Sequence, residues 1–299
     1  MLRRLKNWFL QKIQEMPFRV FRWRVKLLDL FHLPIRTRYG FRFIPTFDEN
    51  SILALFHRDH RLEEYDLRFV ARFLRQGDIF IDIGAHHGLY SLLADICVKP
   101  YGKVISFEPS PRERSRLLNN IAANKLEKIV HVEAYALTDK KGEATLFVSS
   151  SYESGLNSLK PPNSQFNIES TITIQTYTLD DYVKEHSINT IRLIKMDAEG
   201  AELSILRRSI DVLTRIRPVW LIEVESFRTL PWGYAAEEIL RFLEAYGYRW
   251  YVAQKEGLQP FHYTPETRLN RNYIAIPQEQ AETILAYLQQ RPFRGFPKG

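Results

Sequence analysis

The chain has 299 residues, 45% of them hydrophobic and 26% charged, which is typical of a globular protein large enough to bury a sizeable core. It contains one cysteine, Cys97, so an internal disulfide is excluded and a reducing, cytoplasmic location is expected. No apolar run approaches the ~18 residues of a membrane span, and Arg, Lys and Gln interrupt every candidate signal-peptide core near the N-terminus.

The net charge of +7 belongs to the N-terminal segment. Residues 1–50 contain 11 Lys or Arg and 4 Asp or Glu, whereas the remainder contains 31 of each. Aromatic residues interleave these bases, and a helix there could place four apolar side chains on one face, namely Leu2, Leu5, Phe9 and Ile13. Two interpretations stay open: the segment packs on its own domain, or residues 1–35 contact the inner face of an anionic membrane. Nothing resembles a nucleic-acid-binding module, so no nucleic-acid partner is expected.

A βαβ unit between Gly77 and Pro109 organises the rest of the chain. The apolar run 79–81 predicts a buried strand, a glycine turn follows it, residues 89–98 have helical spacing, and 103–107 predict a second strand. Glu108 ends that strand 20 residues after Gly88, the position at which an acidic side chain holds the hydroxyls of an adenosine ribose. A helix is predicted over 63–75, and we expect Glu64 there to contribute to the cofactor site.

The glycine pattern distinguishes between cofactors. A dinucleotide fold requires Gly-x-Gly-x-x-Gly so that the backbone can approach a pyrophosphate, but this chain has only Gly84-x-x-x-Gly88, with Asp82 two residues earlier. A carboxylate there would repel a diphosphate and suits a cation. S-Adenosylmethionine is cationic and carries no phosphate, so it is the predicted cofactor. The alternative for Asp82 is that it only caps the turn.

Further along the chain, strands alternate with helices. Strands are predicted over 129–137, 144–148, 171–177, 191–196, 218–225, 248–253 and 272–276, with helices from residue 111 and over 201–208 and 235–246, and a long polar loop over 149–168. This alternation predicts a mostly parallel sheet with helices on both faces, in which ligands bind outside the carboxyl ends of the strands. Four acids fall at such ends: Asp82, Glu108, Asp197 and Glu225.

Several segments, in order, resemble the FkbM family of methyltransferases over roughly residues 60–277. They are the runs from Asp82 to Ser91, 107–109, 136–139, 179–181, 194–202, 222–225 and 272–277. The resemblance implies a doubly wound, class I methyltransferase (Rossmann-like) α/β fold with seven strands and S-adenosylmethionine as donor. It also implies O-methylation of a hydroxyl on a sugar, glycolipid or secondary metabolite. The family commonly has Asn and an aliphatic residue where this chain has His86 and His87.

These patterns together define the expected site. The expected cofactor-binding residues are Glu64, Asp82, Gly84, His86, Gly88, Glu108 and Asp139. Asn157 and Ser158 in the polar loop, together with Glu199, are expected to bind the acceptor. Asp197 is the predicted general base, with Lys195 and Glu225 as further catalytic candidates. The alternative for Asp197 is a helix N-cap. Asp197 and Glu225 could also hold a divalent cation, but no ligand-spacing motif supports a metal site, and His86 and His87 alone do not define one.

The chain is expected to comprise a basic, aromatic extension over 1–50, a methyltransferase domain over 51–277, and a C-terminal helix and tail over 278–299. The expected partner is a small-molecule or glycan acceptor. Two other functions are kept as alternatives: a nicotinamide-dependent Rossmann-like protein, and a non-catalytic protein that binds through the basic N-terminus. The missing middle glycine argues against the first, and the retained cofactor residues argue against the second.

Overall fold

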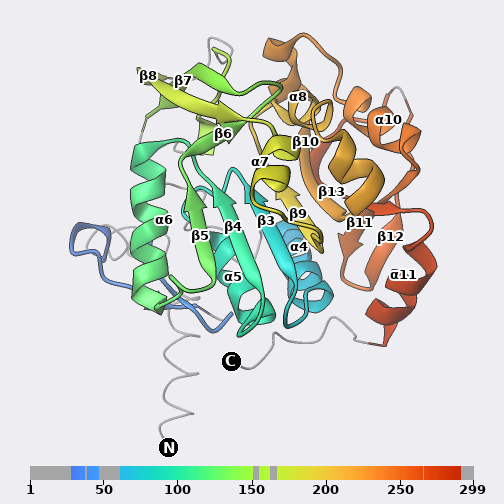
Figure 1. Ribbon diagram of the computed structural model, residues 1–299, viewed down its shortest axis with the longest axis horizontal. Helices are drawn as coiled ribbons and strands as arrows, with labels where there is room; N and C mark the ends of the chain where they lie inside the picture. The colour runs from blue at the N-terminus through green and yellow to red at the C-terminus, as the bar shows by residue number, and fades with distance from the viewer. Residues whose placement is uncertain are drawn as a thin grey trace, which may run out of the picture.

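The computed structural model describes residues 28–37, 39–46, 61–150, 155–161, 167–264 and 266–290. Its centre is a mixed sheet of eight strands in the spatial order β12-β11-β13-β10-β9-β3-β4-β5 (Figure 1). The strands are β3 (Ile79–Ile83), β4 (Lys103–Phe107), β5 (Val130–Glu133), β9 (Leu193–Met196), β10 (Val219–Glu225), β11 (Tyr248–Gln254), β12 (Gly257–Pro260) and β13 (Asn270–Pro277).

Strand β3 lies at the point where the order of strands reverses. It pairs in parallel with β4 on one side and β9 on the other, with Asp82 opposite Lys195. The chain builds the sheet outward from β3 through β4 to β5, and then from β9 in the opposite direction. Such a switch point opens a crevice beyond the carboxyl ends of the strands, where ligands of doubly wound sheets bind.

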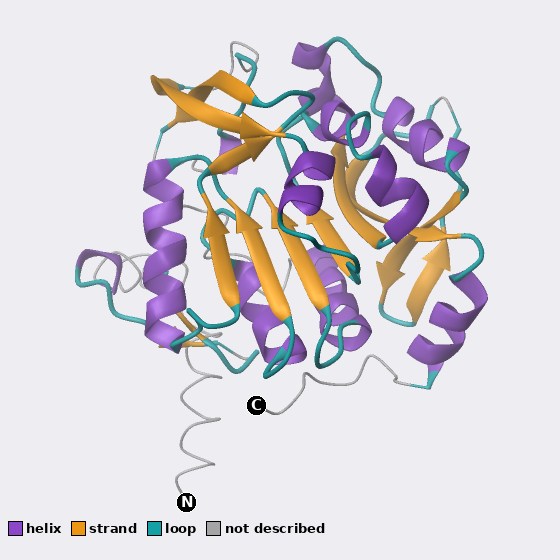
Figure 2. Cartoon of the chain, viewed as in Figure 1, coloured by secondary structure: helices purple, strands orange, loops and turns teal. Residues whose placement is uncertain are grey.

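Helices cover both faces of the sheet, as predicted (Figure 2). One core cluster joins the sheet to α4 (Arg61–Phe73), α5 (Leu89–Val98), α6 (Pro111–Asn124) and α11 (Ala281–Gln289). The other joins it to α7 (Leu179–Glu185), α8 (Glu202–Leu206), a π-helical turn over Val212–Ile216, and α10 (Glu237–Ala245). Successive residues of β3 divide between these clusters, Phe80 entering the first and Ile81 the second. Burial on both faces explains why its sequence is a continuous apolar run.

The sheet has the class I methyltransferase arrangement, with one strand added. Strand β13 pairs antiparallel with β10 and β11, and the other strands from β10 to β5 are parallel. The sheet has one strand more than the seven predicted. The additional strand, β12, forms a hairpin with β11 through Gln254 and Gly257. This edge strand pairs with no other strand of the sheet, so the seven-stranded order is unchanged.

A separate three-stranded sheet lies beside the carboxyl ends of the main strands, at the upper left of Figure 1. Its strands are β6 (Tyr135–Leu137), β7 (Gly142–Ser149) and β8 (Ile168–Tyr177). The prediction of one continuous strand over 129–137 is wrong, because the chain leaves the main sheet after Glu133 and then pairs with β8. Sequence periodicity cannot detect this change, since both pieces are extended and no glycine or proline separates them.

Part of the predicted N-terminal extension belongs to the core. Strands β1 (Ile35–Arg36) and β2 (Arg42–Phe43) form a short hairpin, and its aromatic side chains Tyr39, Phe41 and Phe43 are buried against the main domain. The predicted amphipathic helix over residues 2–13 lies outside the described residues, and the boundaries at 50 and 277 stay predictions. Within the part of the chain that the structure describes, no helix is both long and apolar enough to cross a membrane. A four-residue helix, α9 (Ser226–Thr229), and a 3₁₀ turn over Leu230–Trp232 complete the fold.

Candidate functional site

A cavity of about 510 Å³ lies at the carboxyl ends of β3, β4, β9 and β10. Its volume is within the usual range of ligand-binding cavities, ~300–1,000 Å³. Nine of the residues singled out from the sequence line it: Asp82, Gly84, His86, Glu108, Asn157, Lys195, Asp197, Glu199 and Glu225. The topology therefore brings together residues that are up to 143 positions apart in the sequence.

The glycine turn presses the end of β3 against the end of β9. Gly84 has a φ of +75°, and a Cβ atom there would lie 1.8 Å from the carbonyl oxygen of Asp197. The N–H groups of Gly84 and Ala85 both donate to the carbonyl oxygen of Phe107, at 3.0 Å each, which fixes the turn to the end of β4. Only glycine has both the backbone freedom and the missing side chain that this approach requires.

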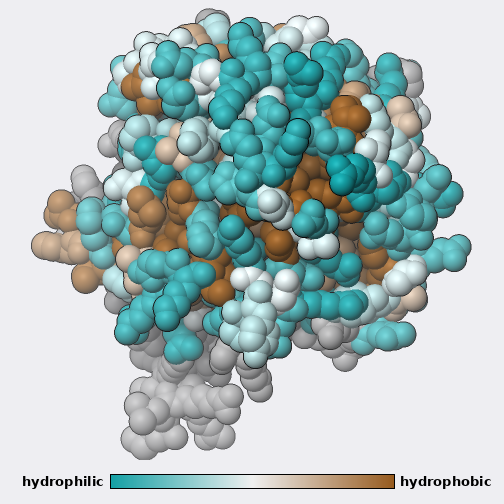
Figure 3. Space-filling view, viewed as in Figure 1, coloured by the Kyte–Doolittle hydropathy of each residue, from teal (hydrophilic) through white to brown (hydrophobic). Residues whose placement is uncertain are grey.

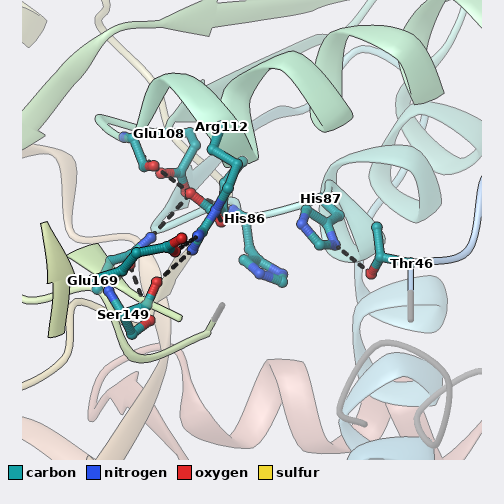
Figure 4. Close-up of polar contacts among 10 residues, drawn as sticks. Thr46, His86, His87, Glu108, Arg112, Ser149 and Glu169 are labelled. Carbon is teal, nitrogen blue, oxygen red and sulfur yellow. Dashed lines mark hydrogen bonds and ion pairs between the residues drawn. The ribbon is translucent and has the colours of Figure 1, made fainter. Parts of the chain in front are cut away.

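Glu108 lies beneath the turn with its carboxylate held by main-chain groups. The N–H of His86 donates to Oε2 at 2.8 Å and the N–H of Ser110 to Oε1 at 2.9 Å (Figure 4). The side chain is 5% exposed, and burial raises the pKa of Glu108 to about 8, an effect that these two N–H groups only partly offset. A carboxylate oxygen can accept two hydrogen bonds, and each oxygen of Glu108 accepts one from these N–H groups. Each oxygen therefore retains one acceptor site for a hydroxyl donor.

Asp82 ties β3 to the first turn of α5. Its Oδ2 accepts a hydrogen bond from Ser91 Oγ at 2.5 Å, and its carboxylate also accepts from the Ser91 N–H. Burial raises the pKa of Asp82 to about 6, and the hydrogen bond from Ser91 and the charge of Lys195 oppose that rise. The contacts with Ser91 include a helix-terminal N–H, so the capping alternative describes part of what Asp82 does. Its carboxyl group nevertheless lines the cavity.

The two histidines of the turn stack on one another, their ring centroids 3.6 Å apart. His87 is buried, and its Nδ1 lies 3.4 Å from Thr46 Oγ1 (Figure 4). Its carbonyl oxygen accepts a hydrogen bond from Asn120. Burial, and secondly the adjacent His86, hold the pKa of His87 well below its usual value. His87 therefore joins the turn to α6 through its carbonyl oxygen and to Thr46 through its neutral ring.

Glu113 lies near the two histidine rings, but its carboxylate is already engaged. Ser110 Oγ, Arg112 Nε and Asn157 Nδ2 all donate to it. Arg112 also reaches the carbonyl oxygen of Ser149 and the carboxylate of Glu169, as Figure 4 shows. These contacts fix the polar loop to α6, and a metal ion at the two histidines would have to displace them from Glu113.

A group of acids forms the other half of the cavity. The carboxyl groups of Asp197, Glu199 and Glu223 have oxygens that all lie within 4.8 Å of one another. Lys195 Nζ lies 3.2 Å from Asp197 Oδ2, and Arg228 binds Glu199 at 2.8 Å. Asp197 and Glu223 are in hydrogen-bonding contact.

The pKa values of this group diverge. Burial acts to raise the pKa of Asp197, but Lys195 and Glu223 outweigh it and hold the value below the usual range. Burial raises the pKa of Glu223 well above its usual value, and the charge of Asp197 adds to the rise. Burial likewise raises the pKa of Glu199, with Arg228 opposing. A pair of carboxyl groups with pKa values pushed apart is a common feature of catalytic sites.

The alternative that Asp197 is a helix N-cap is wrong. Helix α8 begins at Glu202, and no side chain caps it. The N–H groups of Ala198 and Gly200, in the preceding turn, donate to the Glu202 carboxylate instead. The Asp197 carboxylate therefore does not cap this turn, and it contacts Lys195 and Glu223.

Four predicted residues do not line the cavity. Gly88 lies behind the turn against Leu117, and Ser158 donates to the carbonyl oxygen of Glu199. Asp139 is exposed, with its carbonyl oxygen bound by Arg208, and Glu64 forms an ion pair with Arg68 one turn along α4. Glu64 and Asp139 thus lie away from the residues expected to bind the cofactor.

The structure adds residues that the sequence analysis did not select, chiefly Glu223 and Arg228. Strand alternation places Glu223 on the same side as Glu225, so the signal was present. The sequence could not show that Arg228, one turn after β10, would bind Glu225 at 3.1 Å and leave Glu223 to Asp197.

The acidic group does not fit a divalent cation as it stands. Carboxylate oxygens are the right donors for Mg²⁺ or Ca²⁺. However, Lys195 already lies against Asp197 and Arg228 against Glu199, and the remaining contact joins Asp197 to Glu223. A cation could enter only by displacing these partners.

The chain matches the family model of the methyltransferase FkbM domain over residues 82–250. Among curated proteins, it is 25% identical over 169 residues to the hexuronic acid methyltransferase AglP of Haloferax volcanii, covering 56% of this chain and 65% of that protein. It is 25% identical over 153 residues to the 2-O-methyltransferase NoeI of Sinorhizobium fredii, covering 48% of this chain and 61% of that protein. The chain therefore spans less than two thirds of the length of either relative.

Two solved structures share parts of the fold. An rRNA methylase from Streptococcus thermophilus has a TM-score of 0.39 and 13% identity, covering 73% of this chain and 95% of that one. An O-methyltransferase from Bacillus cereus, in complex with S-adenosylhomocysteine, has a TM-score of 0.40 and 12% identity, covering 71% of this chain and 79% of that one. The family model covers more than half of the chain, and the chain belongs to the FkbM methyltransferase family.

Proposed function

We propose that this protein transfers the methyl group of S-adenosylmethionine to a hydroxyl group of a glycan. The observation that carries this proposal is a single cavity with two acidic halves. Glu108 and the Gly84 turn form a donor half, and Asp197, at the end of the adjoining strand, belongs to an acceptor half. Membership of the FkbM methyltransferase family supports the same activity.

The donor half fits S-adenosylmethionine. Glu108 has one acceptor site left on each oxygen, which suits the two hydroxyls of a ribose. Gly84 leaves the turn without a side chain where a ligand must approach the backbone, and Asp82 contributes negative charge near a cationic centre. When bound, S-adenosylmethionine supplies a methyl group whose bond to sulfur breaks with both electrons remaining on sulfur. The acceptor oxygen must therefore supply the pair for the new bond and lose its proton.

Asp197 is the group placed to receive that proton. Its carboxylate lines the cavity and is kept anionic by Lys195 at 3.2 Å. A positioned base typically contributes 10²–10⁴-fold to a rate, and alignment of the acceptor hydroxyl contributes the rest. Arg228 holds Glu199 and Glu225, and Asn157 closes the cavity from the polar loop. We therefore assign these residues to acceptor positioning.

The name of one relative suggests an acidic sugar as the first acceptor to test, and the name of the other suggests a hydroxyl group as the site of methylation. One is a hexuronic acid methyltransferase and the other a 2-O-methyltransferase. The cavity wall contains Arg271, whose Nη2 donates to the carbonyl oxygen of Ala253 at 3.2 Å. Its buried Nε has no hydrogen-bond partner among the described residues. A guanidinium held in this way could bind the carboxylate of a uronic acid.

The experiment combines a binding assay with an acceptor screen. Calorimetry should detect S-adenosylhomocysteine and no NAD, and the reverse result would favour the nicotinamide alternative. The protein is then incubated with S-adenosylmethionine carrying a trideuterated methyl group and with oligosaccharides ending in glucuronic acid, galacturonic acid or a neutral hexose. Mass spectrometry should find the label on an acidic sugar. Cofactor binding without labelling of any glycan in the panel would contradict the proposed acceptor class.

A pair of variants tests the assignment of Arg271. Arg271→Gln should raise KM for acidic acceptors by about tenfold, the usual magnitude of one charge-assisted contact, with little change for neutral ones. Arg249→Gln, at an exposed position on β11, is the matched control and should change neither. Equal effects of Arg271→Gln on acidic and neutral acceptors would remove this residue from acceptor recognition.

We further propose that residues 1–35 hold the protein at the inner, cytoplasmic face of an anionic membrane, where a glycolipid acceptor would reside. All of the net charge lies within residues 1–50, and the described end of this segment exposes Leu30 (70%), Phe31 (65%) and Leu33 (50%). These residues belong to the blue segment that projects at the left of Figure 1, where Figure 3 shows hydrophobic side chains. Each Lys or Arg near an anionic surface contributes about 1 kcal/mol, which salt screens.

Sedimentation with phosphatidylglycerol vesicles tests this second proposal. The full chain should sediment at low salt and much less at high salt, and a chain lacking residues 1–35 should not sediment while retaining its affinity for S-adenosylhomocysteine. If the full chain does not sediment with the vesicles at low salt, the membrane proposal is wrong. If the deletion instead lowers thermal stability without changing sedimentation, the segment packs on its own domain.

A further inference from the structure

The carboxyl groups of Asp197 and Glu223 meet between neighbouring strands. Met196 ends β9 and is paired in register with Ile222 of β10, so the next residues on the two strands, Asp197 and Glu223, lie side by side. Both line the cavity, oxygens of their carboxyl groups lie within 4.8 Å of one another, and the two side chains are in hydrogen-bonding contact. The run 222–225 and the family match both contain Glu223, but the sequence patterns assigned it no role.

Contact of this kind requires a proton between the two groups. An ionised carboxylate only accepts hydrogen bonds, so two ionised carboxylates repel each other, whereas a carboxylic acid can donate to a carboxylate. A pair that shares one negative charge and one proton avoids this repulsion. Which residue carries the charge depends on the surrounding groups.

The surrounding charges favour the anion on Asp197. Lys195 Nζ lies 3.2 Å from Asp197 Oδ2, and the positive charge of Arg228 also acts on Asp197. Glu223 faces Asp197, Glu199 and Lys195. Other acids face the pair from the elements around it: Asp82 on β3 faces Asp197, and Glu202 and Glu225 face Glu199. Each raises the cost of a second negative charge in this half of the cavity.

We propose that Glu223 carries the shared proton and donates it in a hydrogen bond to Asp197, which makes Glu223 a positioning residue for the reaction. This inference rests on the proposed function, because it assumes Asp197 as the base. Glu223 occupies one acceptor site of Asp197 and Lys195 another, so a remaining lone pair is directed into the cavity. The directions of the pKa shifts agree, since the pKa of Glu223 is raised by burial and by Asp197, while that of Asp197 is lowered by Lys195 and Glu223 against the effect of burial.

The neighbouring Glu225 has a different environment and provides the matched control. It lies two residues further along β10 on the same side, and its carboxylate binds Arg228 Nε at 3.1 Å. A guanidinium partner supplies the donors that Glu223 would supply from its own proton. The two glutamates thus have the same side chain and lie on the same strand, and they differ in the group that contacts their carboxyl.

The first measurement locates the proton without any acceptor. The full-length protein, bound to S-adenosylhomocysteine, is labelled with ¹³C at the side-chain carboxyls of Glu, and its resonances are followed through pH 7. Glu223→Gln should remove one resonance of a protonated carboxyl, whereas Glu225→Gln should remove none of that kind. If Glu223→Gln removes only an ionised resonance, the assignment of the proton is overturned.

The second measurement tests whether the proton on Glu223 stabilises the ionised form of Asp197. With ¹³C at the Asp carboxyls, and Asp197→Asn to assign the signal, the midpoint of Asp197 titration is compared between variants. Glu223→Gln keeps a donor and should leave the midpoint nearly unchanged, whereas Glu223→Leu removes the donor and should raise it by about one pH unit or more. A large fall of the midpoint in Glu223→Gln would mean that both groups were ionised, which contradicts the proposal. Glu223→Gln decides this even if Glu223→Leu fails to fold.

A magnesium titration completes the test, because a cation and a shared proton cannot occupy the same place. Calorimetry with Mg²⁺ alone should give no saturable binding that depends on Glu223. Binding in the parent protein that disappears in Glu223→Gln would overturn the proposal in favour of a metal. None of these measurements uses turnover, so failure to find a glycan acceptor leaves their outcome unaffected.

Discussion

The two halves of the cavity hold their carboxylates with different partners. In the donor half, Glu108 accepts from the N–H groups of His86 and Ser110, and Asp82 from Ser91. All of these contacts span at most 22 positions in the sequence. In the acceptor half, Asp197 contacts Glu223, 26 positions away, and Arg228 lies between Glu199 and Glu225.

The difference concerns charge as well as distance. Main-chain N–H groups and hydroxyls leave the donor half with buried carboxyls whose pKa values are raised, about 8 for Glu108 and about 6 for Asp82. In the acceptor half, Lys195 and Glu223 instead hold the pKa of Asp197 low. Burial thus raises the pKa in both halves, and at Asp197 the contacts with Lys195 and Glu223 outweigh it. We infer that the donor half recognises a ligand while the acceptor half keeps one anion ready for a proton.

The largest expected effect is on turnover and is confined to the acceptor half. Asp197→Asn keeps the size of the side chain but removes its charge and basicity, so turnover should fall by roughly 10²–10⁴. The affinity for S-adenosylhomocysteine, measured by calorimetry, should change by less than about twofold. Asp211→Asn, at an exposed position, is the control. Normal turnover of Asp197→Asn on the glycan found in the screen would rule out its role as the base.

The next effect should reach both halves, because Gly84 joins them. In Gly84→Ala the new Cβ would overlap the carbonyl oxygen of Asp197, at 1.8 Å, and φ is +75°. The backbone strain and the overlap together should lower the free energy of unfolding by about 2–4 kcal/mol. Gly77 also has a positive φ, +87°, but nothing lies within 4 Å of its Cβ position, so Gly77→Ala should cost only about 1 kcal/mol.

Chemical denaturation of both glycine variants compares these values. The same two proteins should be titrated with S-adenosylhomocysteine, since displacement of the turn would also weaken donor binding. Equal losses of stability in the two variants would show that the close approach of β3 to β9 contributes nothing.

A smaller effect is expected in the donor half alone. Glu108→Ala removes a carboxylate contact to the ribose hydroxyls worth about 1.5–3 kcal/mol, so the affinity for S-adenosylhomocysteine should fall tenfold or more. Glu127→Ala, at an exposed position after α6, should leave it unchanged. An undiminished affinity of Glu108→Ala would show that the ribose is bound elsewhere.

The last prediction for the donor half concerns pH. Because burial raises the pKa of Glu108 to about 8, from an unfolded value near 4.5, its contribution to stability is fully present below about pH 4.5. That contribution is lost as the pH rises through about 8. In the ligand-free protein, the free energy of unfolding should therefore fall more between about pH 5 and 8 than it does in Glu108→Gln. Parallel curves from denaturant titrations at each pH would contradict the raised pKa.

The sequence predicted several residues of the donor half that line the cavity, because the patterns that select them are local. The apolar run of β3, the glycine turn and Glu108 all lie within one βαβ unit, and steric rules for glycine apply wherever the fold places it. Glu64 and Asp139 were predicted for the same half, yet they lie outside the cavity lining. Nothing in a local pattern shows that Glu64 pairs with Arg68 or that Asp139 faces solvent.

The sequence by itself determined the fold class, because alternating apolar strands and helices, buried on both faces, allow few arrangements other than a doubly wound sheet. Tertiary structure alone decided three other features. The chain leaves the main sheet after Glu133, since pairing with β8 replaces pairing with β4. The Ala198 and Gly200 N–H groups are bound by Glu202, so Asp197 is not needed as a cap. Glu223 rather than Glu225 contacts Asp197, because strand register brings the first against it and Arg228 binds the second.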